Sequence, residues 1–192
     1  MSRESPDTGK ISGWVEVIAR DGRGRIKYIY APPERVLEIE EKEGMQGNPI
    51  ISSLPTKFLD YYWRKNIITN AGLAAIIRLI ASGLQESKFS HIAIGTGTNP
   101  ESATDTALQQ EIKRKAATVT QVTTTVPGDT ALFEATFSSA DGLSGSHTVS
   151  EAGIFNAATG GILLARKVFP GVPLNWNAGD SITIRYFIQM TR

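Results

Sequence analysis

The feature of this sequence that most limits its fold is a long run, residues 116–184, that is rich in Thr, Val, Ala and Gly and almost free of charge. Of the chain's 20 Lys and Arg and 19 Asp and Glu residues, this run holds only seven. Short alternating or β-branched segments within it are separated by turn sequences such as Pro127-Gly128-Asp129 and Asp141-Gly142. Such spacing is typical of antiparallel sandwiches and barrels. We therefore predict a mainly β fold with one or two short helices, either a jelly-roll-like β-sandwich or a barrel.

The chain divides into four predicted parts. Residues 1–12 are polar and are expected to form a flexible N-terminus. Residues 13–30 predict an N-terminal β-hairpin, because two alternating runs flank a turn that contains an Asp-Gly pair. Residues 31–65 are charged and contain Pro and Gly, which favours an extended arm or insertion, although residues 34–44 have features of both a strand and a helix. Residues 66–192 are predicted to form an α+β core domain that ends in the antiparallel sandwich.

Two helices and one strand are expected before the β-rich run. Residues 66–83 predict the clearest helix, with Asn70 as its N-cap, Gly83 as its stop and a buried face of Leu73, Ile76, Ile77 and Ile80. Residues 91–95 predict a short strand and residues 103–115 a second short helix. The later strands are expected at residues 118–126, 131–137, 149–155, 162–168 and 181–190.

Composition argues against several classes of function. The chain has no Cys and two His, which excludes thiolate chemistry, cysteine zinc sites and a multi-histidine metal centre within one chain. The net charge of +1 gives no global reason to bind nucleic acid or an anionic membrane. The longest strongly apolar window, residues 71–81, contains Arg78 and is too short to span a bilayer. We therefore expect no cofactor, no metal, no nucleic-acid partner and no membrane partner.

Enzymatic motifs are weak. Residues 95–98, Gly-Thr-Gly-Thr, lack the Lys and the spacing of a phosphate-binding loop and are interpreted as a tight turn. Ser90 and His91 are adjacent, but no G-x-S-x-G elbow exists and no carboxylate is placed to orient the His. We therefore expect no catalytic residues and no enzymatic activity.

One carboxylate is expected to be buried. Glu151 lies in the mostly apolar segment VSEAGIF, and a buried carboxylate needs a partner. Arg166 or Lys167, on a later predicted strand, would supply it. We favour a structural ion pair between Glu151 and Arg166 over a catalytic role.

Two aromatic groups are candidate interface residues. The first is Tyr61, Tyr62 and Trp63, and the second is Trp176, which lies between two Asn residues in a predicted turn. Exposed aromatic side chains in loops often mark an interface. The alternative, that these rings close the edges of the core, is equally compatible with the sequence.

Several segments together resemble a widespread family of small virion proteins of tailed bacteriophages. The order and spacing of the segments carry this resemblance, which covers about three quarters of the chain. The matching segments are GWVEVIARDGRG (13–24), NIITNAGL (66–73), HIAIGTGT (91–98), TDTAL (104–108), SEAGIFN (150–156), GGILLARKVF (160–169) and GDSITI (179–184). The chain departs from the family pattern at about residues 31–63, where an insertion would reach a neighbouring subunit.

The resemblance implies a non-enzymatic virion component that is assembled in the host cytoplasm. The first expectation is a head decoration (cement) protein on the capsid surface, a homo-oligomer and by family habit a trimer, that binds the major capsid protein. The alternative is a tail fibre, collar or baseplate adaptor that contacts tail proteins and a host receptor. Trp176 and its flanking amides are the feature that would favour a glycan as that receptor.

Overall fold

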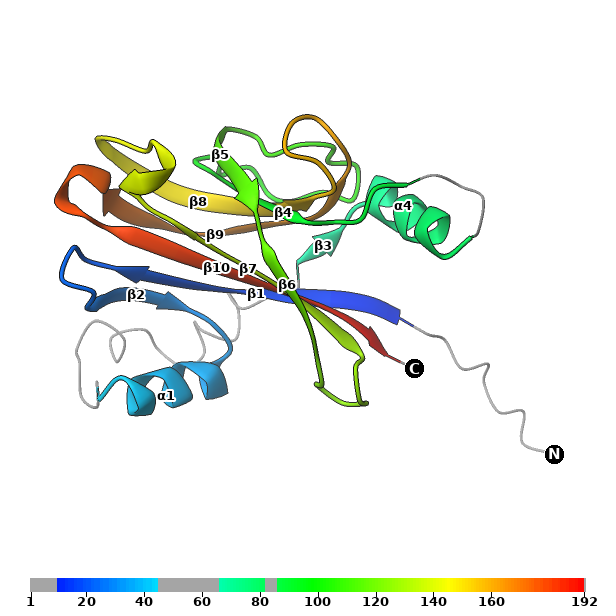
Figure 1. The fold of residues 1–192 in the computed structure, drawn as a ribbon, viewed down its shortest axis with the longest axis horizontal. Coiled ribbons are helices and arrows are strands. Elements are labelled where there is room, and N and C mark those ends of the chain that lie inside the picture. Colours follow the sequence, from blue (N-terminus) through cyan, green and yellow to red (C-terminus); the bar gives the residue numbers. More distant parts are fainter. Residues whose placement is uncertain (1–9, 45–65, 82–85, 192) are drawn as a thin grey trace.

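The described part of the chain is a two-layered β-sandwich. The structure, a computed structural model, describes residues 10–44, 66–81 and 86–191. In these ranges the strands form two antiparallel sheets of five, which pack face to face and do not close into a barrel (Figure 1). The predicted β-sandwich is confirmed, and the barrel alternative is wrong.

The first sheet has the strand order β2-β1-β10-β7-β6. Its strands are β1 (Lys10–Arg20), β2 (Ile26–Tyr30), β6 (Thr118–Val122), β7 (Thr130–Phe137) and β10 (Ser181–Thr191). Strands β1 and β2 pair as the predicted N-terminal hairpin. Residues 10–12, expected to be flexible, instead pair with residues 189–191 of β10 as the start of β1.

The second sheet has the order β3-β9-β8-β4-β5. Its strands are β3 (Ile67–Ile68), β4 (His91–Gly95), β5 (Glu111–Ala116), β8 (Ser146–Phe155) and β9 (Leu163–Asn175). The β7–β10 pair of the first sheet continues as the β8–β9 pair of the second, so one ribbon rolls across both layers, as in a jelly roll.

The core lies between the sheets. Alternate residues of a strand point to one face, so Val15, Val17 and Ile184 of the first sheet meet Ile92 and Ile154 of the second. All five side chains are almost completely buried. The short 3₁₀ helices η1 (Ser139–Asp141) and η2 (Trp176–Ala178) lie at the two crossings between the sheets, after β7 and after β9.

Helix α1 (Pro33–Lys42) covers part of the outer face of the first sheet (Figure 1). Its residues Val36 and Ile39 share one helical face and pack with Ile18 and Ile29 of the hairpin. The predicted extended arm is therefore wrong for residues 33–42, because this apolar pair folds the segment back on its own sheet. Residues 45–65 of the predicted arm lie outside the described residues.

Helix α4 (Asn70–Ile80) is shorter than the predicted helix over residues 66–83. Its N-cap is Thr69 rather than Asn70, since the Thr69 Oγ1 accepts a hydrogen bond from the Gly72 amide at 2.9 Å. The expected stop, Gly83, lies outside the described residues, and the helix ends at Ile80.

The predicted helix over residues 103–115 is wrong. Residues 111–116 form β5, which pairs antiparallel with β4, and residues 103–110 form a loop. The strand pairing satisfies backbone groups that a helix would otherwise have satisfied internally.

The β6–β7 turn is closed by Asp129. The Gln189 side-chain amide and the backbone amides of Thr124, Thr125 and Val126 donate to its carboxylate at 2.9–3.0 Å. These donors hold the pKa of Asp129 well below its usual range. They also end β6 at Val122, four residues before the predicted end, because residues 124–126 bond to the carboxylate instead of a strand.

We predict that Asp129→Asn lowers the melting temperature at pH 7. Because the folded-state pKa is lower than that of the unfolded chain, the ionised carboxylate stabilises the fold above about pH 4, and this contribution is lost as the pH falls further. The difference between wild type and variant, measured by circular dichroism melting from pH 7 to pH 2, should shrink at the acidic end. A difference that is constant with pH would contradict this account.

Candidate functional site

Glu151 and Arg166 form a buried ion pair between neighbouring strands. Glu151 on β8 is fully buried and Arg166 on β9 is 2% exposed. The Arg166 Nε and Nη2 atoms lie 2.9 and 2.8 Å from the Glu151 Oε2. Of the two cations that the sequence offered, Arg166 therefore takes this position.

The same carboxylate also holds the loop between β4 and β5. The backbone amides of Gly97, Gln109 and Gln110 donate to Glu151 at 3.0, 3.0 and 2.7 Å. A Cβ at Gly95 or Gly97 would overlap this carboxylate, so the Gly-Thr-Gly segment is needed for close approach. These bonds also explain why residues 103–110 are not helical, since two of their amides are used by Glu151.

The outer side of Arg166 is held by the same loop. Its Nη1 pairs with Asp105 at 3.0 Å, and its Nη2 donates to the Asn99 carbonyl at 3.1 Å. Burial lowers the pKa of the Arg166 guanidinium, but the hydrogen bonds to Glu151 and Asp105 outweigh burial and raise the pKa above its usual value. Lys167 pairs separately with Glu101 at 2.7 Å. This network holds the loop in place and leaves neither charge free.

The structure does not support Trp176 as an exposed interface residue. Trp176 is 1% exposed, and its indole Nε1 donates to the His147 Nδ1 at 3.1 Å. The turn formed as expected, but the indole closes the end of the core, so this interface prediction is wrong. Tyr61, Tyr62 and Trp63 lie outside the described residues.

Ser90 and His91 contact each other, with the Ser90 Oγ 3.0 Å from the His91 Nδ1. Among the residues that the structure describes, no carboxylate lies within ion-pair distance of His91. A base that activates a serine is normally oriented by such a third group. The described geometry therefore provides a local contact between neighbours rather than a triad.

Helix α4 exposes its large apolar side chains. Gly72 and Ala75 are the residues it buries, and a Cβ at Gly72 would lie 2.6 Å from the Leu164 carbonyl oxygen on β9. The predicted buried face is wrong for Leu73, Ile77 and Ile80, which are 41%, 63% and 70% exposed, whereas Ile76 is partly buried against the core. The two small residues let the helix backbone approach β9, and this docking turns the larger side chains outward. We call Leu73, Ile77 and Ile80 the α4 surface.

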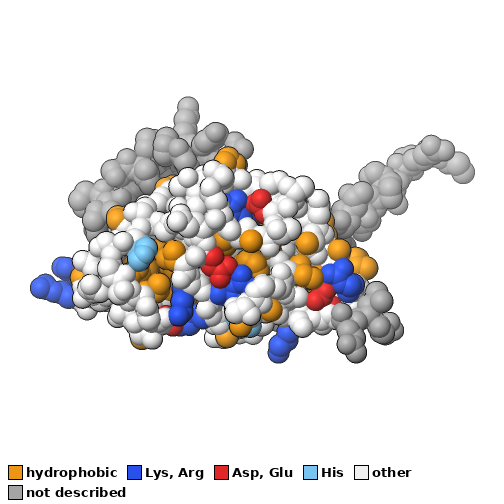
Figure 2. Space-filling model, turned by 90° about the horizontal axis from the view of Figure 1, so that it is seen from above, with side chains coloured by type: hydrophobic (Ala, Val, Ile, Leu, Met, Phe, Trp, Pro, Cys, Tyr) orange, Lys and Arg blue, Asp and Glu red, His pale blue; other side chains and the backbone are white. Residues whose placement is uncertain are grey.

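An apolar groove continues from this helix. It has a volume of about 400 Å³ and lies between Ile76 of α4, Val119 of β6 and Met190 of β10, with Leu164 and Ile188 among its lining. Figure 2 shows hydrophobic side chains exposed at the end of the molecule that carries α4. Exposed apolar surface that is contiguous in this way marks an interaction site more often than scattered single residues do.

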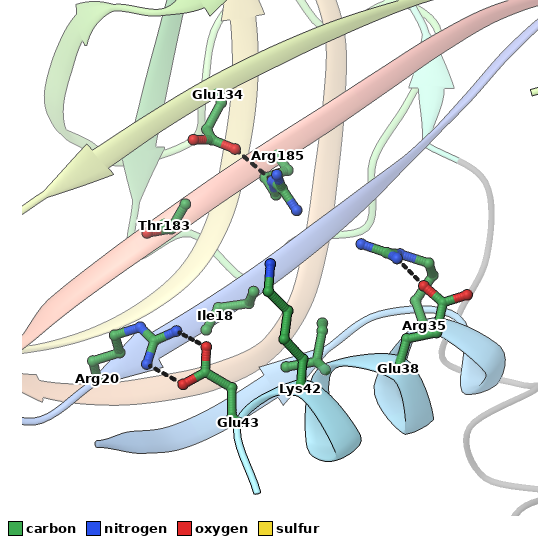
Figure 3. Close-up of a pocket in the computed structure, with 10 residues that line it drawn as sticks. Ile18, Arg20, Arg35, Glu38, Lys42, Glu43, Glu134, Thr183 and Arg185 are labelled. Atoms are coloured by element: carbon green, nitrogen blue, oxygen red, sulfur yellow. Dashed lines mark hydrogen bonds and ion pairs between the residues drawn. The ribbon is translucent and has the colours of Figure 1, made fainter. Parts of the chain in front are cut away.

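A second cleft, of about 310 Å³, lies between α1 and the outer face of the first sheet and is lined by charges (Figure 3). Arg20 pairs with Glu43 at 2.9 Å, which lowers the pKa of Glu43. Figure 3 shows Lys42 extending between this pair and the Arg35–Glu38 pair, and Lys42 makes no ion pair with the described residues.

Beside this cleft, the fully buried Glu16 of β1 accepts a hydrogen bond from the Arg35 Nε at 2.9 Å and lies 3.6 Å from the Arg185 Nη1. The bond to Glu16 raises the pKa of Arg35. Arg185 also pairs with Glu134 on β7. The charges of this region are mostly paired with one another, and the pairs hold α1 on the sheet.

No metal or membrane-spanning element is evident in the described residues. Over residues 10–44, 66–81 and 86–191, no group of three or more His, Asp or Glu side chains is placed to hold a metal ion. Neither α1 nor α4 is long and apolar enough to cross a bilayer, and the described ranges contain no other candidate.

Sequence reasoning missed two of these features, and only the first of them had a signal in the sequence. The signal for the α4 surface was the pair of small residues Gly72 and Ala75, three positions apart in a mostly apolar helix. Such a spacing places both on one face and allows that face to pack closely. Glu16 occupies an outward register position on β1, opposite Arg185 of β10. That pairing joins residues far apart in the sequence, and only the fold reveals it.

We predict that Glu151→Gln lowers the free energy of unfolding by about 3–5 kcal/mol, because it leaves Arg166 buried without its counter-charge. Glu151→Gln combined with Arg166→Met should cost less than the sum of the two single changes. Urea unfolding of the three variants measures this coupling. Additive effects would contradict a direct pair.

We predict that Gly72→Ala destabilises the protein by about 1–3 kcal/mol, because the added methyl group meets the Leu164 backbone. Helix propensity alone would give the opposite sign, a gain of about 1 kcal/mol. The exposed position Ala74 is the matched control, where Ala74→Gly should cost about 1 kcal/mol. Thermal unfolding that shows a gain for Gly72→Ala would mean that α4 does not pack closely on β9.

No protein-family model, no curated protein and no solved structure matches this chain. The described residues combine a framework in which Glu151 and Arg166 are buried and paired with an exposed apolar surface beside a groove.

Proposed function

We propose that this chain is a non-enzymatic structural protein of a tailed-bacteriophage virion, and within the virion a head decoration protein that binds and stabilises the assembled capsid. The observation that carries the proposal is the α4 surface with its adjoining groove. The resemblance of residues 13–24 and 66–184 to phage virion proteins gives the setting in which such a surface would be covered.

The energetics favour a partner on the α4 surface. Burying an exposed Ile side chain is worth about 1.5–3 kcal/mol, and two Ile residues here are more than 60% exposed. A protein that binds only the assembled shell stabilises that shell by mass action. The paired charges beneath the surface keep its supporting strands rigid, which lowers the entropic cost of binding.

The proposed partners are the major capsid protein and further copies of this chain. The contact with the capsid protein is assigned to the α4 surface. Self-association as a homotrimer follows the habit of the family that the chain resembles, and assembly is proposed to take place in the host cytoplasm. The protein would then reside on the capsid surface of the virion, with no contact to nucleic acid or membrane.

The alternative is a tail fibre, collar or baseplate adaptor that binds a host receptor. The feature that favoured this alternative was an exposed Trp176, and that side chain is buried. The decoration proposal therefore takes precedence.

We predict that Ile77→Glu weakens binding to capsid shells by about 10–100-fold, because a charge replaces an apolar contact of about 1.5–3 kcal/mol. The matched control is Leu37→Glu on α1, where a Leu of 65% exposure lies away from α4. Cosedimentation with shells that lack the protein measures binding of each variant.

The location of the protein is tested separately by immunogold electron microscopy of intact virions. Gold over the head is expected. Gold confined to the tail would overturn the decoration proposal in favour of the adaptor, and equal shell binding by both Glu variants would overturn the assignment of the α4 surface.

A further inference from the structure

A third cleft lies on the second sheet, away from α4 and from the charged cleft. It has a volume of about 690 Å³, within the range of ligand sites in proteins. One wall is the start of β8, and the other is the loop after β4. It opens where the β8–β9 pairing is interrupted: Val149 pairs with Val172 and Glu151 with Val168, so residues 169–171 bulge out opposite Ser150.

The walls of this cleft carry polar side-chain groups that make no hydrogen bond within the described part of the chain. Thr98 on the loop and Ser146 and Thr148 on β8 line it, and their hydroxyl groups make no hydrogen bond with the described residues. Gln110 uses its Oε1 to accept from the Thr96 hydroxyl at 2.9 Å, which leaves its Nε2 as a free donor. Each hydroxyl can both donate and accept.

His147 borders the cleft and has a defined tautomer. Its Nδ1 accepts the hydrogen bond from the Trp176 indole, so the neutral ring carries its proton on Nε2. Alternate residues of a strand point to opposite faces, so its ring lies on the core side of β8, opposite the Ser146 and Thr148 side chains. The bond to the buried indole therefore anchors the β8 wall of the cleft.

No Lys, Arg, Asp or Glu side chain lines the cleft, and the other two lining hydroxyls, of Thr96 and Ser150, already donate hydrogen bonds. Val168, Phe169 and Pro170 contribute the apolar part, and of these Phe169 is only 4% exposed. The charged groups of β8 and β9 next to the cleft are buried and paired: Glu151 with Arg166, and Lys167 with Glu101. A charged ligand would therefore find no counter-ion in this cleft. A purely apolar ligand would leave the hydroxyl and amide groups of the cleft unpaired.

We propose that this cleft binds a neutral polyhydroxylated ligand, an oligosaccharide. Sugar hydroxyls match the cleft hydroxyls and the Gln110 amide, and the C–H faces of a sugar ring match the accessible apolar side chains of Val168 and Pro170. The assignment goes beyond the proposed role in the virion and does not depend on it.

The cleft is organised before a ligand arrives. Glu151 fixes the amides of Gly97 and Gln110 in the loop wall. The Ser150 hydroxyl, at the base of the β8 wall, donates to the Gly97 carbonyl at 2.9 Å and ties the two walls together. Fixed walls reduce the ordering cost of binding, which matters for a flexible, well-hydrated ligand such as a sugar.

The test is an NMR titration of the full chain, labelled with ¹⁵N. The probes are maltotriose, cellotriose, triacetylchitotriose and the charged sialyllactose. At least one of the three neutral trisaccharides should shift the backbone amides of residues 96–98, 146–150, 168, 169 and 171. No shift with any neutral trisaccharide, or shifts confined to sialyllactose, would overturn the proposal.

Two matched variants localise the site. Thr148→Trp fills the cleft from an exposed position of β8 and should weaken binding at least tenfold. Thr118→Trp makes the same change at an exposed position of β6 in the other sheet and should leave affinity unchanged. Thermal melting checks that both variants fold, and equal affinities of two folded variants would overturn the location. The α4 variant Ile77→Glu should bind the sugar normally, which separates this proposal from the decoration role.

Discussion

The carboxylate of Glu151 joins the second sheet to the β4–β5 loop, and the position of this loop depends on that carboxylate. Taking a carboxylate out of water costs several kcal/mol, and the cost is offset only when counter-charge and hydrogen-bond donors surround it. Here Arg166 and three backbone amides do so together. The donors come from β9 and from both ends of the β4–β5 loop, so the loop cannot leave without exposing an unsatisfied buried charge.

Glu16 is a second buried carboxylate, on the first sheet, and its ion pairs are more exposed to solvent. It is fully buried on β1, but its partners Arg35 and Arg185 keep about a third of their side chains exposed. Water screens such partners, so the attraction is smaller than for the enclosed Arg166. Helix α1 relies in addition on the packing of Val36 and Ile39. The two carboxylates thus stabilise opposite sides of the sandwich, and the buried charges are committed to structure.

Local patterns in the sequence predicted most of the sheet but few of its contacts. Alternation and turn residues identified the hairpin and the strands that became β4 and β6–β10, because both signals act over a few neighbouring residues. The pairing of Glu151 with Arg166 was predictable because a charge in an apolar segment requires a partner. The helix expected over residues 103–115 does not form because the amides of Gln109 and Gln110 bond to the Glu151 side chain, 42 and 41 residues away. The prediction of which face of α4 is buried was wrong for a related reason. Hydrophobicity favoured burial of Ile77, but the small Gly72 is the residue that allows close contact with β9.

The docking of α4 through Gly72 and Ala75 has a consequence for the free subunit. A helix that meets its sheet through a hydrogen atom and a methyl group gains little from that contact, and most of its hydrophobic surface contributes nothing until something covers it. The free chain therefore exposes apolar side chains on α4, and any contact between chains through them would be favoured at higher protein concentration. If the proposed capsid contact covers these side chains, binding would remove this exposed apolar area from water.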